Sequence, residues 1–297
     1  MTTVDHSLRF GLVGTGHWAQ LTHAPALATT DGIEFTSVWG RDSAAAAALA
    51  APYEARAHVD FGDFLAEVDA VAFAVPPDVQ ASLALTAAAA GKHLLLEKPV
   101  ATSAAEADKL AQAVRDAHVS SVVFFTSRFQ PEVRTWLASL GDRSQWAAGS
   151  AVWLGTALQP GNPFNSSWRH DKGGLWDLAP HAVSLLSASL GPVTSVTADS
   201  GEGDLTYLVL HHEGGATSTV TVTLQAPDAA ECFMLSLWGE QGWTSAPTTM
   251  DPVEALSVAL TELAGCVQDG RAHPCDAAFG RDVVHILADA QAQLDAR

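Results

Sequence analysis

Cysteine is scarce in this sequence of 297 residues. Only three are present, Cys232, Cys266 and Cys275, and they are widely separated and in no metal-ligand spacing. A disulfide framework or a zinc site needs more cysteines or a closer spacing. We therefore expect no disulfide and no bound metal, and a reducing cytoplasm as the location.

Long apolar runs and basic clusters are absent too. No stretch of about 18 uncharged apolar residues occurs, and the first residues include no basic stretch followed by an apolar one. Only 15 basic side chains stand against 33 acidic ones, for a formal charge of −18 at pH 7. A negative field repels phosphate backbones and anionic membranes. We expect no export signal, and neither nucleic acid nor a membrane as a partner.

The residues that are present predict a folded, mostly α/β chain. The apolar fraction of 48% excludes disorder. Up to residue 125, short apolar runs alternate with helical stretches, which predicts parallel βαβ units. The expected strands are residues 8–13, 35–39, 70–75, 93–96 and 122–125, and the expected helices are residues 18–29, 43–51, 83–90 and 104–117.

A second pattern follows. Glycine-flanked, β-branched stretches at residues 193–197, 206–211, 217–224 and 232–238 predict consecutive antiparallel strands, and two helices close the chain. We predict an α/β Rossmann domain over residues 1–124 and an α+β domain with a mainly antiparallel, open-faced sheet over residues 125–297. The second domain would bind substrate and form a homodimer or homotetramer through the uncovered face. For the two closing helices, the alternative to membership of the second domain is packing back on the first domain.

A glycine-rich fingerprint follows the first strand and opens the first helix. It reads Gly14-Thr-Gly-His-Trp-Ala19. Glycines at this place permit a tight turn and close approach of a pyrophosphate to a helix N-terminus. We expect Gly14, Thr15, Gly16, His17 and Trp18 to bind a dinucleotide.

The residues at the end of the second expected strand bear on the choice between NAD(H) and NADP(H). NAD-preferring folds usually carry a carboxylate there for the ribose 2′-hydroxyl, whereas this chain reads Val38-Trp-Gly-Arg-Asp42. Gly40 takes the place of the acid, and Arg41 would pair with a 2′-phosphate. We predict NADP(H) over NAD(H). The alternative is a solvated Arg41, with Asp42 turned inward to serve NAD.

Two further segments carry groups suited to proton transfer. Glu97 and Lys98, one of only four lysines, lie at the expected carboxyl end of a buried strand, where open α/β sheets bind ligands. Asp177 and His181 are four residues apart and would share one helical face. The alternatives are a surface lysine, a carboxylate at a helix end and an unrelated core histidine.

Together these segments resemble the Gfo/Idh/MocA family of NAD(P)-dependent oxidoreductases over nearly the whole chain. The resemblance rests on the fingerprint and on Val75-Pro-Pro77, Glu97-Lys-Pro99, Arg128-Phe-Gln-Pro131, Trp168-Arg169, and Gly173-Gly174 leading to Asp177 and His181. Departures include Asp78-Val-Gln80, where relatives often carry a histidine soon after the prolines, and Ser184, where an aspartate is frequent.

The resemblance implies a catalytic triad of Lys98, Asp177 and His181. His181 would act as general acid/base, Lys98 would hydrogen-bond the reacting oxygen, and Asp177 would orient the pair. The further residues expected at the cofactor are Val75, Pro76, Glu97, Lys98, Arg128, Trp168 and Arg169. Those expected at the substrate are Lys98, Asn165, Trp168, Asp177 and His181.

Aromatic faces beside amides and guanidinium groups suit a sugar or polyol, and Trp153, Asn165, Trp168 and Arg169 fall in the stretch that enters the expected site. The expected function is an NADP(H)-dependent oxidoreductase that acts on a secondary alcohol or ketone of a sugar, cyclitol or related polyol. Two alternatives stay open. One is transient oxidation that drives elimination or glycoside cleavage, and the other is a non-catalytic NADP-binding sensor.

Overall fold

The structure, a computed structural model, describes residues 7–296, and the chain divides into two compact units. The first unit comprises the residues up to Phe124 together with Asp251–Arg281, and the second comprises Phe125–Met250 together with the residues from Asp282 onward. The second boundary falls inside helix α10 (Ala277–Asp295), which therefore contributes residues to both units.

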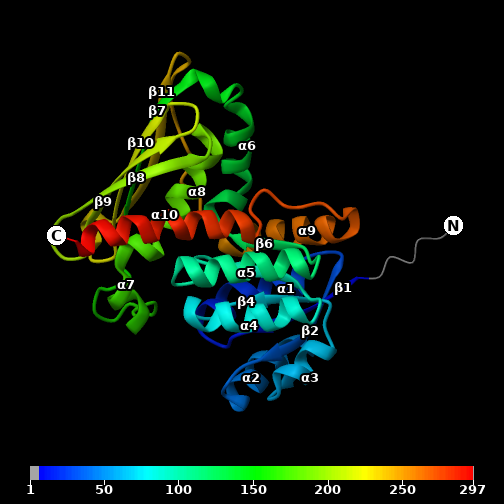
Figure 1. The fold of residues 1–297 in the computed structure, drawn as a ribbon. Helices are drawn as coiled ribbons and strands as arrows, with labels where there is room; N and C mark the ends of the chain where they lie inside the picture. Colours follow the sequence, from blue (N-terminus) through cyan, green and yellow to red (C-terminus); the bar gives the residue numbers. More distant parts are fainter. Residues whose placement is uncertain (1–6, 297) are drawn as a thin grey trace. The chain divides into compact units, whose positions relative to one another are not determined.

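The first unit is built on a six-stranded parallel sheet with the strand order β3-β2-β1-β4-β5-β6. Figure 1 labels β1, β2, β4 and β6 of this sheet. The strands are β1 (Leu8–Val13), β2 (Ile33–Trp39), β3 (Arg56–His58), β4 (Ala70–Phe73), β5 (His93–Glu97) and β6 (Ser121–Phe124). Both β4 and β6 are buried along their whole length, as expected for strands covered on both faces. The chain order reverses between β1 and β4, and parallel sheets bind ligands at such a point.

The connecting segments of this unit are helical. They are the π-helix η1 (Ala19–His23), α1 (Ala24–Thr29), α2 (Ser43–Ala50), the 3-10 helix η2 (Ala51–Tyr53), α3 (Phe61–Ala66), α4 (Pro77–Ala89) and α5 (Ala104–Asp116). Local sequence sets where several of them begin. Asp42 caps α2, Asp60 caps α3, and Ser103 caps α5 by accepting a hydrogen bond from the backbone of Glu106.

A segment from late in the chain completes the first unit. Helix α9 (Pro252–Asp269) packs against α1, η1, β5 and β6. The residues after α9 then hydrogen-bond to β6, because Val123 N donates to Cys275 O at 2.7 Å and Ala277 N donates to Ser121 Oγ at 3.0 Å. These bonds join β6 to backbone more than 150 residues away in sequence.

The second unit contains a six-stranded mixed sheet with the order β12-β11-β7-β10-β9-β8. Its strands are β7 (Trp146–Leu154), β8 (Val193–Ser200), β9 (Thr206–His212), β10 (Thr217–Thr223), β11 (Cys232–Gly239) and β12 (Gly242–Ser245). Its helices are η3 (Thr126–Phe129), α6 (Pro131–Ser139), η4 (Arg143–Gln145), α7 (Ser167–Asp177), α8 (Ala179–Leu190) and η5 (Asp228–Ala230). Helix α8 packs on β7 and β10.

The predicted fold class is confirmed, with one correction to the strand order. Strands β8, β9 and β10 pair antiparallel as expected, but β7 lies between β10 and β11 and pairs parallel with β10. The sequence of β7 begins Trp-Ala-Ala-Gly-Ser-Ala, and alanine and glycine have low strand propensity. Because of this composition, the central strand β7 was not predicted from the sequence pattern.

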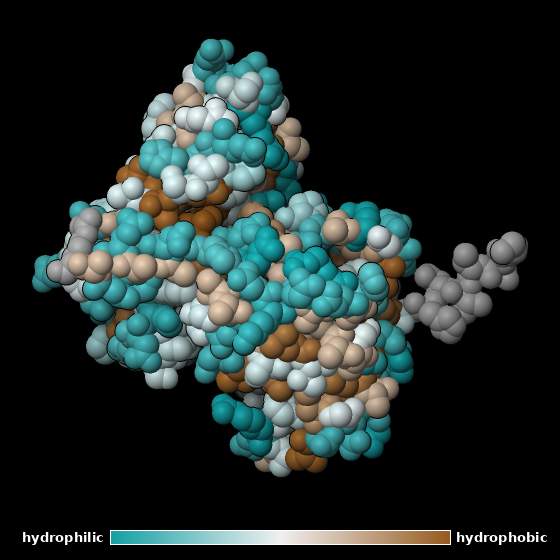
Figure 2. All heavy atoms as spheres, viewed as in Figure 1, coloured by the Kyte–Doolittle hydropathy of each residue, from teal (hydrophilic) through white to brown (hydrophobic). Residues whose placement is uncertain are grey.

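On the face drawn in Figure 2, hydrophilic residues predominate and the hydrophobic atoms form separate groups. Within residues 7–296, no helix combines the length and the apolar character needed to cross a bilayer.

The half-buried residue His93 at the start of β5 gives a prediction about pH. The Nδ1 atom of His93 accepts a hydrogen bond from Ser120 N at 3.0 Å, and burial lowers the pKa of His93 below its usual 6.5. As pH falls through 6.5, the unfolded chain takes up this proton before the folded chain does, so the free energy of unfolding decreases. Urea unfolding between pH 7.5 and 5, chosen to bracket the usual histidine pKa of about 6.5, measures this slope.

The matched variant is His93→Asn, which keeps an acceptor near Ser120 N and cannot titrate. It should show a shallower dependence on pH, with a remaining slope from His212, whose pKa burial also lowers. An unchanged slope in the variant would exclude His93 as a source.

Candidate active site

The fingerprint loop has the geometry that a pyrophosphate requires. Gly14 has a φ of 121°, and a Cβ atom there would lie 2.3 Å from the carbonyl oxygen of Ala74. At Gly16 a Cβ would meet nothing within 4 Å, so the loop is open on that side. Gln20 N donates to Gly16 O at 3.1 Å and begins the helix there. A tight glycine turn, an open approach and a helix N-terminus together fit a dinucleotide.

Val75 lies beside this loop, because a Cβ on Gly14 would be 3.0 Å from Val75 Cγ1. Pro76 follows it and occupies the N-cap position of α4. The expected cofactor residues Gly14, Gly16 and Val75 are therefore neighbours at the point where the strand order reverses.

The turn after β2 contains Gly40, Arg41 and Asp42. Gly40 packs against the loop, and a Cβ there would be 2.8 Å from Thr15 Cγ2. Asp42 Oδ1 accepts hydrogen bonds from Ala44 N at 2.9 Å and Ala45 N at 3.1 Å, so this carboxylate caps α2. Arg41 is exposed beside it.

Glu97, at the carboxyl end of β5, is linked to the fingerprint helix. Its Oε1 atom accepts from Trp18 Nε1 at 2.6 Å and from His23 Nε2 at 2.9 Å, and Lys98 N donates to its Oε2 at 3.3 Å. His23 is fully buried in the π-helical turn η1, a feature common at functional sites. Sequence analysis missed His23; its only signal is a polar residue on the otherwise apolar side of the first helix.

Asp177 and His181 lie on either side of the junction between α7 and α8. Both are buried, and His181 N donates to Leu178 O at 3.1 Å. Gly173, with φ 63° and ψ −168°, breaks the preceding helix. The kink is fixed by Asp204, a residue that sequence analysis missed, which accepts from Gly174 N at 2.9 Å and Leu224 N at 2.8 Å.

The Asp177 carboxylate pairs with an arginine. Arg169 Nε donates to Asp177 Oδ2 at 2.7 Å, and the Arg169 guanidinium lies 4.8 Å from the centre of the Trp168 ring. Trp153 of β7 lies 5.0 Å from the ring of His181 and 4.4 Å from that of Phe233. The second unit thus brings together Trp153, Trp168, Arg169, Asp177 and His181.

Other expected site residues make local contacts within the second unit. Arg128 Nη1 donates to Ser184 O at 2.7 Å and ties η3 to α8. Asn165 Oδ1 lies 2.8 Å from His170 Nε2. Lys98 belongs to the first unit, whereas Asp177 and His181 belong to the second.

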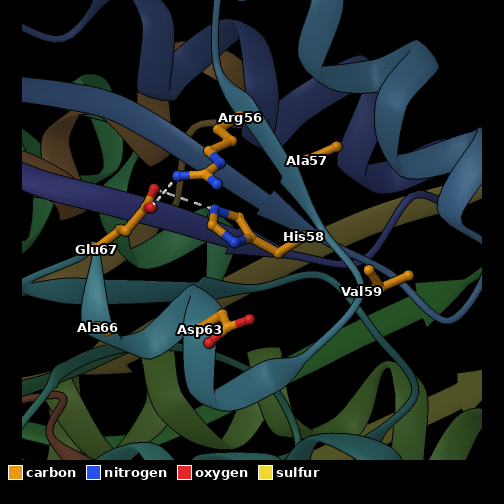
Figure 3. Close-up of a pocket in the computed structure, with 7 residues that line it drawn as sticks. All are labelled: Arg56, Ala57, His58, Val59, Asp63, Ala66 and Glu67. Atoms are coloured by element: carbon orange, nitrogen blue, oxygen red, sulfur yellow. Dashed lines mark hydrogen bonds and ion pairs between the residues drawn. The ribbon is translucent and has the colours of Figure 1, made fainter.

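A pocket of about 390 Å³ lies elsewhere in the first unit, at the edge strand β3 (Figure 3). Glu67 points toward Arg56 and His58 across it, with Oε2 at 3.3 Å from His58 Nε2. None of the expected site residues lines this pocket, and Glu67 pairs with both Arg56 and His58.

Comparison with known proteins identifies the family. The sequence model described as "Oxidoreductase family, NAD-binding Rossmann fold" matches residues 8–125, and the model of the GFO/IDH/MocA C-terminal domain matches residues 147–245. The chain belongs to the GFO/IDH/MocA oxidoreductases. The predicted resemblance and the expected dinucleotide-binding Rossmann fold are confirmed.

Relatives in this family include enzymes named as dehydrogenases. An uncharacterised oxidoreductase of Synechocystis sp. is 31% identical over 205 residues, which are 66% of this chain and only 55% of that protein. Inositol 2-dehydrogenase of Rhizobium meliloti is 26% identical over 74% of this chain and 70% of its own length. The solved structure of levoglucosan dehydrogenase with NADH and levoglucosan has a TM-score of 0.86 at 18% identity, covering 98% of both chains, and shows the shared fold.

The fingerprint geometry predicts what a methyl group would do at Gly14. Gly14→Ala combines a left-handed backbone, which costs about 1–3 kcal/mol, with a contact that forces the loop away from Ala74. We expect a lower free energy of unfolding in urea and loss of dinucleotide binding in a fluorescence titration. Gly32→Ala is the control, because Gly32 also has a positive φ, 80°, but open space around it.

Gly32→Ala should lower the free energy of unfolding by less than Gly14→Ala does, and it should leave the cofactor affinity unchanged. Equal cofactor affinity in the two variants would contradict the role given to the Gly14 turn.

Proposed function

We propose that this chain is an NADP(H)-dependent oxidoreductase that transfers a hydride to or from a secondary alcohol or ketone carbon of a sugar, cyclitol or related polyol. The observation that carries the proposal is the hydrogen bond of 2.6 Å between Trp18, in the fingerprint, and Glu97, next to Lys98. It fixes a lysine-bearing strand end beside a dinucleotide loop.

The dinucleotide would be held by the open loop at Gly14–Gly16, with Thr15, His17 and Trp18 around it and Val75 and Pro76 beside it. When bound, the nicotinamide supplies the acceptor or donor of the hydride. Glu97, by orienting Trp18 and the backbone of Lys98, supports the end of the site nearest the reacting carbon.

The proton that accompanies the hydride needs a group on this chain. His181 is the proposed general acid/base, since imidazole titrates nearest neutrality. Lys98 would donate a hydrogen bond to the reacting oxygen and stabilise its developing negative charge. Asp177 would orient this pair and keep the net charge of the site low, and its carboxylate accepts a hydrogen bond from Arg169 at 2.7 Å.

The proposed preference for NADP(H) rests on Gly40, Arg41 and Asp42. No side chain extends from Gly40 to accept from a 2′-hydroxyl, and the Asp42 carboxylate already accepts two backbone N–H groups of α2. These observations weigh against the alternative in which Asp42 serves NAD. Arg41, exposed at the same turn, would pair with a 2′-phosphate.

The proposed substrate class is supported by the aromatic ring of Trp153 beside His181, and by Arg169, which lies on the Trp168 ring and pairs with Asp177. Asn165 adds an amide in the same segment. Flat aromatic faces pack on the CH faces of sugar rings, and polar groups fix their hydroxyls. Relatives named inositol 2-dehydrogenase and levoglucosan dehydrogenase point the same way. A homodimer or homotetramer remains a prediction.

The cofactor proposal is tested with Arg41→Ala. Loss of a charge-assisted hydrogen bond, about 1.5–3 kcal/mol, should raise the Kd for NADPH by roughly 10- to 100-fold and leave the Kd for NADH unchanged. Tryptophan quenching by each nucleotide measures both constants. The control, Arg143→Ala, removes one exposed arginine of the second unit and should change neither constant. A preference of the unaltered protein for NADH would refute the proposal.

The catalytic proposal is tested with Lys98→Met. We expect kcat to fall by about 100-fold or more, the usual loss for a group that stabilises developing charge, while the Kd for NADPH changes little. Turnover is followed by NADPH formation with myo-inositol, aldoses and alditols. Lys109→Met, on the exposed side of α5, is the control and should keep full activity. An active Lys98→Met enzyme would remove this lysine from the mechanism.

A further inference from the structure

Gln80 is a fully buried polar residue in the first turn of α4. Its side-chain amide pairs with one backbone unit of β5 in both directions. Gln80 Nε2 donates to Glu97 O at 2.8 Å, and Glu97 N donates to Gln80 Oε1 at 2.7 Å. This is the donor and acceptor pattern that a neighbouring strand offers.

The two hydrogen bonds between Gln80 and Glu97 lie beyond the point where the neighbouring strand β4 ends. Pairing of β5 with β4 runs from His93 to Leu95 and stops two residues before Glu97. Without Gln80, the buried N–H and C=O of Glu97 would lose these partners, which costs free energy. The side chain of Gln80 therefore continues the hydrogen bonding of the sheet by one more step.

The same amide reaches past Lys98. Gln80 Nε2 also lies 3.3 Å from Pro99 O and 3.4 Å from Val100 O. One buried side chain thus contacts backbone on both sides of Lys98. All of these contacts are to backbone atoms.

We propose that Gln80 is a positioning residue for Lys98: it fixes the backbone from Glu97 to Val100 so that the lysine side chain starts from one defined place. The inference rests on the proposed function insofar as Lys98 acts on the reacting oxygen. A displacement of about 1 Å in a positioned group can cost on the order of 100-fold in rate, because catalysis depends on near-attack geometry.

The test replaces the amide by a thioether of similar length, Gln80→Met. We expect kcat to fall by about 100-fold with little change in KM or in the Kd for NADPH. The matched control is Gln293→Met. Gln293 makes the same two-way contact with the backbone of β8, where its Nε2 donates to Val196 O at 2.9 Å and its Oε1 accepts from Ala198 N at 3.1 Å. This variant should keep its kcat.

A second readout follows Lys98 without turnover. The sequence has only four lysines, so reductive methylation with ¹³C-formaldehyde gives few NMR signals, and Lys98→Met identifies that of Lys98. In Gln80→Met the Lys98 signal should shift toward that of an exposed methylated lysine, while the signals of Lys92, Lys109 and Lys172 stay in place. In Gln293→Met all four should stay.

An unmoved Lys98 signal in folded Gln80→Met protein would overturn the positioning role, as would a general shift of all the signals. The proposed function fails separately, by full activity of Lys98→Met, and the NMR result would still decide whether Gln80 sets the place of Lys98.

Discussion

A carboxylate buried at the end of a strand must be hydrogen-bonded, and in the first unit this requirement joins the cofactor loop to the sheet. Glu97 is buried, and burying an acidic group without donors costs several kcal/mol. Trp18 and His23 supply two donors, both from the helix that the glycine fingerprint opens. The orientation of that helix therefore depends on β5, and the backbone that carries Lys98 is bonded to the same carboxylate.

The second unit meets the same requirement in a different way. Asp177 is buried at a helix junction and is paired with Arg169, whose guanidinium also lies on the Trp168 ring. Asp204 is a second carboxylate, and its bonds to Gly174 and Leu224 hold the kink before Asp177 against the end of β10. Gly174 must be small there, since a Cβ would lie 3.0 Å from Thr223 Cα. The ion pair with Arg169 and the bridge from Asp204 to the sheet both help to set the place of Asp177.

The parts of the structure that sequence could predict are those encoded locally. Apolar runs alternating with alanine-rich stretches were enough for five of the six strands of the parallel sheet, whereas the short edge strand β3 (Arg56–His58) was missed. A glycine turn between strand and helix was enough for the loop at Gly14. The missed features depend on contacts between distant residues. His23 and Glu97 are 74 positions apart, Gln80 and Glu97 are 17 apart, and Asp204 reaches Gly174 across 30. The periodicity of a sequence carries no signal for such pairs. Strand β7 was missed for another reason, because its alanine and glycine residues have low strand propensity.

Gln80, in the segment Asp78–Gln80 that departs from the family pattern, has a structural role of its own. Its uncharged amide both donates and accepts, and a backbone unit beyond the end of a strand needs both. A neutral imidazole donates through one nitrogen and accepts through the other, so it can meet the same two needs only if the ring is oriented along the strand. The glutamine pairs with the backbone beside Lys98 without a group that titrates near neutrality, so this pairing does not depend on pH in that range.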